Sequence, residues 1–281
     1  MVIIRLVGAL IRAALVILMV ALPSLILSDQ SVDGAEVVAL IALFGAALTL
    51  FEYAPTYPCL IEFRDAPPFN RIRFFSLFAT VLFLSLMVSG HFDPTPLTQF
   101  IQAVGMVIGQ SVDFPYSPVT LVKLLLPDGA DAAQINLICS AAGMAFLISL
   151  LTLSIFVLSL RVYGWPARSG SFNVWVNLPL FDPTAGGDVL ERLQRNARIN
   201  IALGFLLPFA VPAMVKLAAD LIDPVTLQNP QTLIWTIAAW AFLPASIIMR
   251  GIAMGKIADM IEEKRKRAYA QQAASEGLQA A

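Results

Sequence analysis

Six long apolar segments dominate the pattern of hydrophobic and polar positions along the chain. Each has close to the roughly 20 residues that a helix needs to cross the hydrocarbon core of a bilayer. Strands of a membrane barrel would instead be about ten residues long and alternate in polarity, which these segments do not. The pattern therefore predicts six membrane-spanning helices, which cover residues 6–27, 37–54, 74–90, 135–160, 199–222 and 233–257.

Two shorter apolar runs lie within residues 97–126, between the third and fourth predicted spans. Each follows a helix-start signal, a hydroxyl residue and then proline, in Thr95-Pro96 and Ser117-Pro118. Neither run is long enough to span, so we expect two short helices that lie flat at the outer interface. The alternative is a re-entrant hairpin that dips into the bilayer and turns between the two runs, which would suggest a pore.

The first apolar segment has two interpretations, because its start is basic, with Arg5 just before it and Arg12 in its first part. It is either a first span that stays attached or the core of a secretory signal peptide. The segment is long, and no small-residue cleavage site follows it before the acidic loop. We therefore expect an uncleaved first span.

Residues 172–178 alternate with a period of two, unlike the helical segments around them. Phe172, Val174 and Val176 fall on one face. Trp175 falls on the other, and this alternation is typical of a β-strand. No second strand of similar quality occurs, so we expect either an extended segment on the membrane surface or an edge that pairs with a partner protein.

Helical patterns continue on either side of the last two spans. A helix is expected from Asp188, because acidic and basic residues there are spaced four apart. The sixth span is followed by charged residues without glycine or proline as far as residue 274, so it should continue as one rod and fray from about Ser275. The chain then consists of a transmembrane domain, residues 1–257, and a helical extension with a frayed tail, residues 258–281.

Composition supports a membrane protein and excludes other classes. Hydrophobic residues make up 58% of the 281 and charged residues 13%, against usual shares of about 45–50% and about 25%. The mean hydropathy is +0.79. So few charges cannot cover a water-facing surface, which argues against a soluble enzyme, a disordered protein and a nucleic-acid binder.

The charges are sorted between the two sides of the predicted membrane. With the N-terminus inside, 16 of the 18 Lys and Arg residues fall in inner segments, and only Lys123 and Lys216 fall in outer ones. Lys and Arg gather on the cytoplasmic side of membrane proteins. We therefore predict an all-α, multi-pass protein of the inner (plasma) membrane with both termini in the cytoplasm.

Candidate residues for a transport pathway lie in the last two spans. Prolines interrupt both spans, and breaks of this kind can expose backbone to a substrate. The ionisable residues of these spans lie near their ends, and none falls at a midpoint, which argues against an ion-coupled carrier. The candidate pathway residues are Pro208, Pro212, Lys216, Asp220, Pro244 and Arg250. Glu52 and Glu62 border the first inner loop, where we expect them to be solvated rather than to act as ligands.

Candidate contacts with partners and lipids complete the set. Gly251 and Gly255 form a GxxxG pair that lets another helix approach closely. We therefore predict that they bind a partner, together with Phe172, Val174, Trp175 and Val176. Arg192, Arg195 and Arg198 form a basic stripe that can meet anionic lipid headgroups.

No catalytic, metal or cofactor motif stands out. Cys59 and Cys139 fall on opposite sides of the predicted membrane, so they cannot form a disulfide, and His91 is the single histidine. We expect no cofactor and no catalytic or metal site. The predicted partners are the lipid bilayer and a membrane-protein partner or a second copy, and not nucleic acid.

The pattern favours a non-catalytic accessory, assembly or scaffold subunit of a membrane complex. The alternative is a channel or passive small-solute transporter that uses the two proline-broken spans. A membrane-embedded enzyme has the least support, because no constellation of catalytic residues appears.

Overall fold

The computed structural model describes residues 2–27, 32–57, 59–64, 68–127, 129–166, 177–182, 186–219, 227 and 229–279. Every element within these residues is a helix. Six of the helices are long and apolar enough to cross a membrane, which confirms the prediction of an all-helical, multi-pass protein. They are α1 (Val2–Ile26), α2 (Val32–Tyr53), α3 (Phe69–Phe92), α6 (Ala132–Tyr163), α8 (Val189–Ala219) and α9 (Pro230–Gln279).

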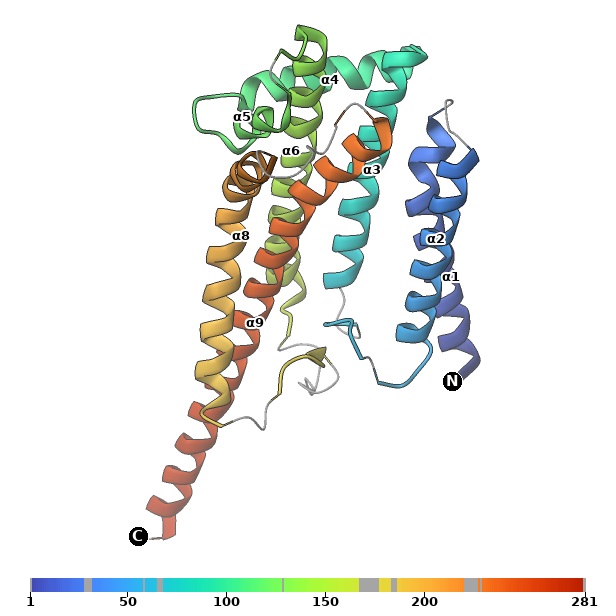
Figure 1. Ribbon diagram of the computed structural model, residues 1–281. Helices are drawn as coiled ribbons and strands as arrows, with labels where there is room; N and C mark the ends of the chain where they lie inside the picture. The colour runs from blue at the N-terminus through green and yellow to red at the C-terminus, as the bar shows by residue number, and fades with distance from the viewer. Residues whose placement is uncertain are drawn as a thin grey trace.

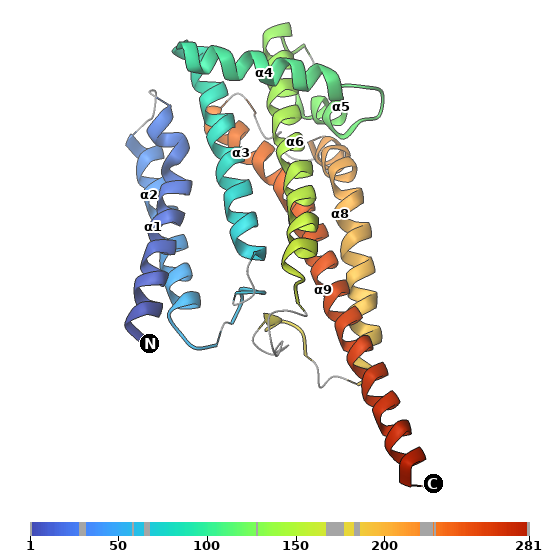
Figure 2. The same cartoon turned by 180° about the vertical axis from the view of Figure 1, so that it is seen from behind.

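The two ends of the bundle differ in what they carry. The N-terminus and the C-terminus lie at the same end, here called the termini end (Figure 1). The opposite end carries α4 (Pro96–Val112), α5 (Pro118–Val122) and a 3-10 turn (Lys123–Leu125), and is here called the α4 end. The hairpin of α1 and α2 stands beside a bundle formed by α3, α6, α8 and α9, as both views show (Figure 2).

The two helices of the α4 end begin at the predicted signals. Thr95 caps α4 in a reciprocal pair with Thr98, and Ser117 accepts a hydrogen bond from the Thr120 N–H at 3.0 Å. α4 runs across the ends of the spans and does not dip between them (Figures 1 and 2). It crosses α6 where two glycines meet, since a Cβ on Gly143 would lie 2.6 Å from the Cα of Gly109.

The prolines of α8 and α9 do not open a gap between these helices. Pro212 has no N–H, so the carbonyl of Pro208 one turn earlier loses its helical partner. The indole Nε1 of Trp240 on α9 donates to that carbonyl at 3.0 Å. Nearby, a Cβ on Gly204 of α8 would lie 2.7 Å from the carbonyl oxygen of Pro244. The two helices therefore pack directly against each other at the predicted break points.

The buried side chains form two clusters along the bundle. The cluster toward the α4 end joins α3, α4, α6 and α9 and includes Leu22 of α1 and Leu27 just after it. The cluster toward the termini end joins the α2–α3 loop, α3, α6, α8 and α9, and none of its described members belongs to α1 or α2. The α1–α2 hairpin is thus fastened to the core near the α4 end.

α9 is the longest helix and continues well past the bundle (Figure 1). It follows the prediction of one rod, and it passes Ser275, where fraying was expected, to end at Gln279. Asp188 joins this rod to the start of α8, because its carboxylate binds the Nη1 and Nη2 atoms of Arg265, each at 2.8 Å. It also caps α8 by accepting the Leu190 N–H at 3.0 Å.

Candidate functional site, an arginine-lined cavity

The loop between α2 and α3 folds back against the end of α2. The carboxylate of Glu52 accepts hydrogen bonds from the backbone N–H groups of Cys59, Leu60 and Ile61, at 3.0–3.1 Å. Glu52 and Glu62 are only 7% and 8% exposed. The expectation that these two carboxylates are solvated is therefore wrong. A buried carboxylate needs hydrogen-bond donors, and the backbone N–H groups of the loop supply them to Glu52. Glu52 thus organises the loop from its inner side.

Arg64 fastens the same loop from the other side. Its guanidinium donates to the carbonyl oxygens of Glu52 at 2.7 Å, Pro55 at 2.9 Å and Thr56 at 2.7 Å. Carbonyls at a helix C-terminus lack partners within the helix, and a basic side chain there satisfies them. The end of α2 and the loop thus form one hydrogen-bonded unit.

Phe63 turns the chain so that its neighbour Glu62 reaches α9. Phe63 adopts a left-handed conformation, with φ of 56°, which is uncommon for a residue with a side chain. Its ring is fully buried against Phe69 at 4.6 Å and Trp165 at 5.9 Å between ring centroids. Its N–H donates to the carbonyl of Asn177 at 2.6 Å. The packing of the ring offsets the cost of the backbone conformation.

Glu62 and Arg250 form a two-point ion pair. The Nε and Nη2 atoms of Arg250 bind the two carboxylate oxygens of Glu62 at 2.5 Å and 2.8 Å. The remaining nitrogen, Nη1, donates to the Oδ1 atom of Asn200 on α8 at 3.2 Å. The amide of Asn70 donates to the Glu62 carbonyl at 2.8 Å. This network joins the loop, α3, α8 and α9 around one charge pair.

Arg73 on α3 supplies a second, partly buried guanidinium beside this pair. Its Nε atom is buried and has no hydrogen-bond partner among the described residues, and Nη1 makes only a long contact of 3.4 Å to Asn70. The guanidinium lies over the rings of Phe69 and Phe242, at 5.4 Å and 5.9 Å from their centroids. A buried donor without a partner is costly, so Arg73 retains an unused capacity to bind an acceptor.

These groups line a cavity of about 940 Å³ between the α1–α2 hairpin and α3 and α9. Apolar residues of α1, α3, α9 and the α2–α3 loop form much of the wall. Among the described residues, the charged members of the wall are five arginines and one carboxylate, namely Arg12, Arg64, Arg71, Arg73, Arg250 and Glu62. The cavity is therefore positive as well as partly apolar, and it lies toward the termini end.

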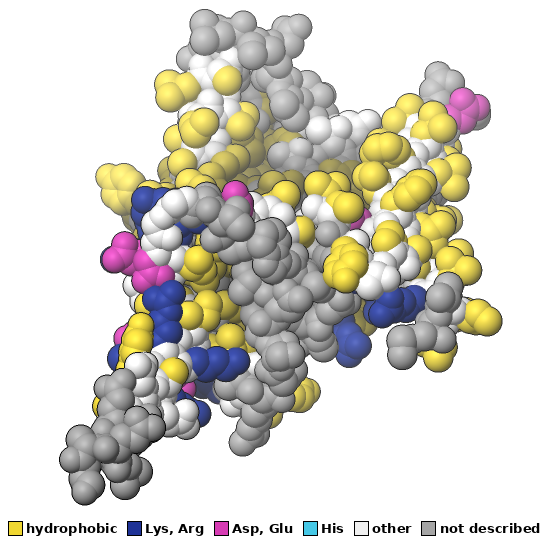
Figure 3. Space-filling view, turned by 90° about the horizontal axis from the view of Figure 1, so that it is seen from below, with side chains coloured by type: hydrophobic (Ala, Val, Ile, Leu, Met, Phe, Trp, Pro, Cys, Tyr) yellow, Lys and Arg dark blue, Asp and Glu magenta, His cyan; other side chains and the backbone are white. Residues whose placement is uncertain are grey.

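The surface around the termini end is also positively charged. Lys and Arg side chains gather on the face seen from below, both beside the α9 extension and at the foot of the α1–α2 hairpin (Figure 3). Hydrophobic side chains cover the flank of that hairpin in the same view. The guanidinium of Arg12 lies over the ring of Tyr53 at 4.7 Å, which links the two helices of the hairpin beside the cavity.

Of the predicted pathway residues, only Arg250 lies in the wall of this cavity. Pro208, Pro212 and Pro244 belong to the packed contact of α8 with α9 described above. Lys216 lies on α8, and Asp220 lies outside the described residues.

Of the predicted partner-binding residues, the two glycines are described and the four residues of the alternating segment are not. Gly251 packs against α8 of the same chain, since a Cβ there would lie 2.8 Å from the carbonyl oxygen of Ala197, and Gly255 faces Ala197 as well. Phe172, Val174, Trp175 and Val176 lie outside the described residues. The described end of that segment, Asn177 and Leu178, forms no strand.

The predicted basic stripe is used partly inside the protein. Arg192 donates to the carbonyl of Asp182 at 2.8 Å and lies over the ring of Phe181 at 4.8 Å. Arg195 and Arg198 are exposed on α8, where lipid headgroups remain their predicted contact. Asp188, at the start of α8, is bound by Arg265 of α9.

The sequence signalled only part of this site. Arg250 stood out because an arginine deep in a span needs a partner or a route to water. Glu62 and Arg73 did not, because charges near the end of a span are ordinary anchors in a sequence. Their role depends on a loop that folds back, and the signal for this was weak: a charged loop interrupted by prolines.

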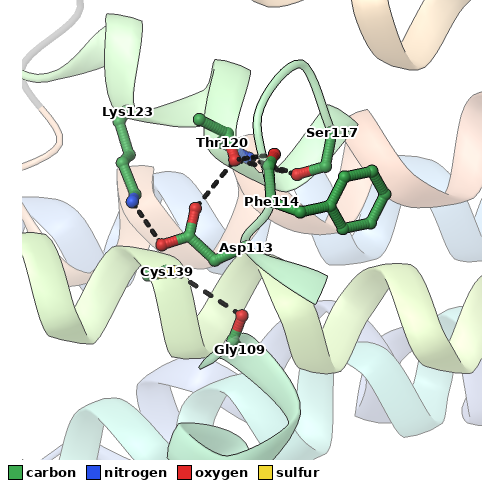
Figure 4. A network of polar contacts seen from close by, with 7 residues as sticks. All are labelled: Gly109, Asp113, Phe114, Ser117, Thr120, Lys123 and Cys139. Carbon is green, nitrogen blue, oxygen red and sulfur yellow. Dashed lines mark hydrogen bonds and ion pairs between the residues drawn. The ribbon is translucent and has the colours of Figure 1, made fainter. Parts of the chain in front are cut away.

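A second polar cluster holds the α4 end together (Figure 4). Asp113, just after α4, accepts hydrogen bonds from Lys123 and from the Thr120 hydroxyl, the latter at 2.7 Å. Partial burial raises the pKa of Asp113, but these two hydrogen bonds and the charge of Lys123 outweigh it, so the pKa lies below its ordinary value. Cys139 lies nearby and donates a weak hydrogen bond to the Gly109 carbonyl at 3.9 Å. The cluster closes the turn between α4 and α5 and has a structural role.

Comparisons of the chain with protein-family models, with curated proteins and with solved structures find no match.

Proposed function

We propose that this chain is a non-catalytic, multi-pass protein of the inner membrane that binds an anionic group in its arginine-lined cavity. Its termini lie in the cytoplasm, and it serves as an accessory, assembly or scaffold subunit. The observation that carries the proposal is the surplus of guanidinium groups over carboxylates in the cavity wall.

Guanidinium groups suit recognition rather than proton transfer. Arginine stays protonated at any physiological pH, so it cannot act there as a general acid or base. Its planar donors match the oxygen atoms of phosphate and carboxylate groups. Glu62, the one carboxylate among the described residues of the wall, is already held at two points by Arg250. The wall is thus equipped to hold an oxyanion in place.

The alternative of a channel or passive transporter through α8 and α9 receives less support. That model needs a water-filled path along the prolines of the two helices. Gly204 instead brings α8 against the Pro244 carbonyl, and Trp240 takes up the carbonyl that Pro212 leaves without a partner. Both contacts bring the helices together at the level where a path is required.

The proposal is tested with inorganic phosphate as the probe anion. The full chain in a neutral detergent is titrated with phosphate against chloride at constant ionic strength, and its thermal unfolding midpoint is followed. Bound anion stabilises the folded state, so the midpoint of the wild type should rise with phosphate concentration. Arg73→Gln should reduce this rise, and Arg73→Lys should retain part of it.

Arg161→Gln is the matched control, because Arg161 is an exposed arginine at the termini end that does not line the cavity. It should respond to phosphate as the wild type does. If phosphate raises the midpoint of Arg73→Gln as much as that of Arg161→Gln, the anion binds elsewhere and the proposed site is wrong.

A further inference from the structure

The mouth of the arginine-lined cavity opens along the side of the bundle. Three residues of its wall, Ile11 on α1, Phe75 on α3 and Leu243 on α9, are 56%, 64% and 53% exposed. All three belong to helices that are candidate membrane spans. The exposed face of such a helix meets hydrocarbon in a bilayer. The mouth is therefore reached from the membrane as well as from the termini end.

Along α3 and α9, the basic residues of the wall lie closer to the termini end than the exposed apolar residues Phe75 and Leu243. On α3, Arg71 and Arg73 precede Phe75 in the direction away from the termini end. On α9, Arg250 lies seven residues from Leu243, which corresponds to about 10 Å along a helix. The basic groups are thus near the membrane surface and the apolar groups are deeper. A phospholipid has the same order, with its phosphate at the interface and its acyl chains below.

The size of the cavity fits an amphiphile better than a free anion. Its volume of about 940 Å³ is at the upper end of the roughly 300–1,000 Å³ of ligand pockets. A phosphate group on the arginines fills only the basic part. Acyl chains would occupy the apolar part, where a small soluble anion makes no contact.

The α1–α2 hairpin forms a side wall of the cavity, attached by direct contacts near the α4 end and through the α2–α3 loop near the termini end. Near the α4 end, Gln231 donates to the Ser24 hydroxyl at 2.8 Å, and Ser89 donates to the Ile26 carbonyl at 3.4 Å. Near the termini end, the described core cluster contains no residue of α1 or α2. A lipid can therefore enter between the hairpin and α3 without disrupting that cluster.

We infer that the cavity takes an anionic phospholipid of the membrane leaflet on the termini side. The arginines hold its phosphate group, and its chains run along the apolar wall. This inference rests on the proposed function, since both require an oxyanion at the arginines. It adds the source of that anion, which is the bilayer and not the aqueous phase.

The test measures which lipid stays with the protein. The full chain is reconstituted into vesicles of phosphatidylglycerol and phosphatidylcholine in equal amounts, with matched acyl chains. It is then extracted in a neutral detergent, and the retained lipids are counted by native mass spectrometry. The wild type should retain phosphatidylglycerol in preference. Arg73→Gln should lower this preference about fivefold, the effect typical of one arginine near an anionic surface. Arg161→Gln should leave it unchanged, and Arg73→Lys, which keeps the charge, should lower it less than Arg73→Gln.

The outcomes separate the two proposals. One outcome is that the wild type retains both lipids equally while inorganic phosphate still stabilises it in a way that depends on Arg73. This result overturns the lipid proposal and leaves the anion site. A preference for phosphatidylglycerol that Arg73→Gln does not change also overturns it, since the lipid then binds elsewhere. If the wild type shows neither the lipid preference nor the phosphate response, both proposals are overturned. A preference that depends on Arg73 supports both, whether or not free phosphate binds.

Discussion

At the scale of single residues, the most informative pair is Glu62 with Arg250. They lie 188 positions apart in the sequence, so nothing in the local pattern links them. In the sequence, Arg250 lies two turns from the inner end of its span, so its side chain needs either a route to the interface or a partner, and the structure supplies the carboxylate. Removing two charges from water is expensive, and the mutual attraction repays this only when the geometry is good. The two-point contact and the bond to Asn200 meet that condition.

We expect Arg250→Met alone to destabilise the protein by about 3 kcal/mol, because it leaves Glu62 buried without a partner. The double variant Glu62→Gln, Arg250→Met should recover much of this loss, because neither site then carries a charge. Thermal unfolding of the purified protein in detergent measures both effects. A double variant that is as unstable as the sum of the two single variants would show that the residues do not interact.

At the scale of elements, the sequence predicted the helices well and their contacts poorly. Each predicted span corresponds to one of the six long helices, because the length of an apolar run decides whether a helix can cross a bilayer. The caps of α4 and α5 were also predicted, since capping depends on neighbours in the chain.

The arginine-lined cavity could not be predicted in the same way. It is built by side chains of the α2–α3 loop, α1, α3 and α9, which only tertiary packing brings together. Where α4 crosses α6 likewise depends on two glycines in different helices, Gly109 and Gly143. The GxxxG pair at Gly251 correctly indicated a close helix contact, but the helix that fills it is α8 of the same chain.

The turn between α4 and α5 should lose stability in acid. The pKa of Asp113 is lowered in the folded protein, so its contribution is complete above its ordinary pKa of about 3.9 and is lost as the pH falls through the lower, folded value. Asp113→Ala should cost about 1 kcal/mol at pH 7, a modest amount because the pair is partly exposed. The difference in unfolding midpoint between this variant and the wild type should shrink as the pH falls from 5 toward 3. A difference that stays constant would mean that the carboxylate charge contributes nothing.

At the scale of the whole molecule, the two ends of the protein differ in charge and in how the α1–α2 hairpin is attached. The basic residues counted as inner in the sequence lie, where they are described, toward the termini end, and Lys123 and Lys216 lie toward the α4 end. An even number of crossings brings both termini to one side whatever the orientation. The charge asymmetry then decides which side of the membrane that is. The cavity belongs to the same end, so its leaflet follows from the orientation.

The two cysteines of the chain can report this orientation without any added label site. Cys59 is exposed in the loop at the termini end, and Cys139 is buried on α6 toward the α4 end. With the termini in the cytoplasm, a membrane-impermeant maleimide should label the protein in inside-out vesicles and not in intact spheroplasts. Cys59→Ser should abolish the labelling, and its backbone N–H can still bind Glu52, so the loop should keep its fold. Labelling of Cys59 from outside would reverse the orientation and would move the arginine-lined cavity to the opposite leaflet. The anionic lipid would then have to come from that leaflet. Reconstitution into vesicles that carry phosphatidylglycerol in one leaflet only can distinguish the two cases.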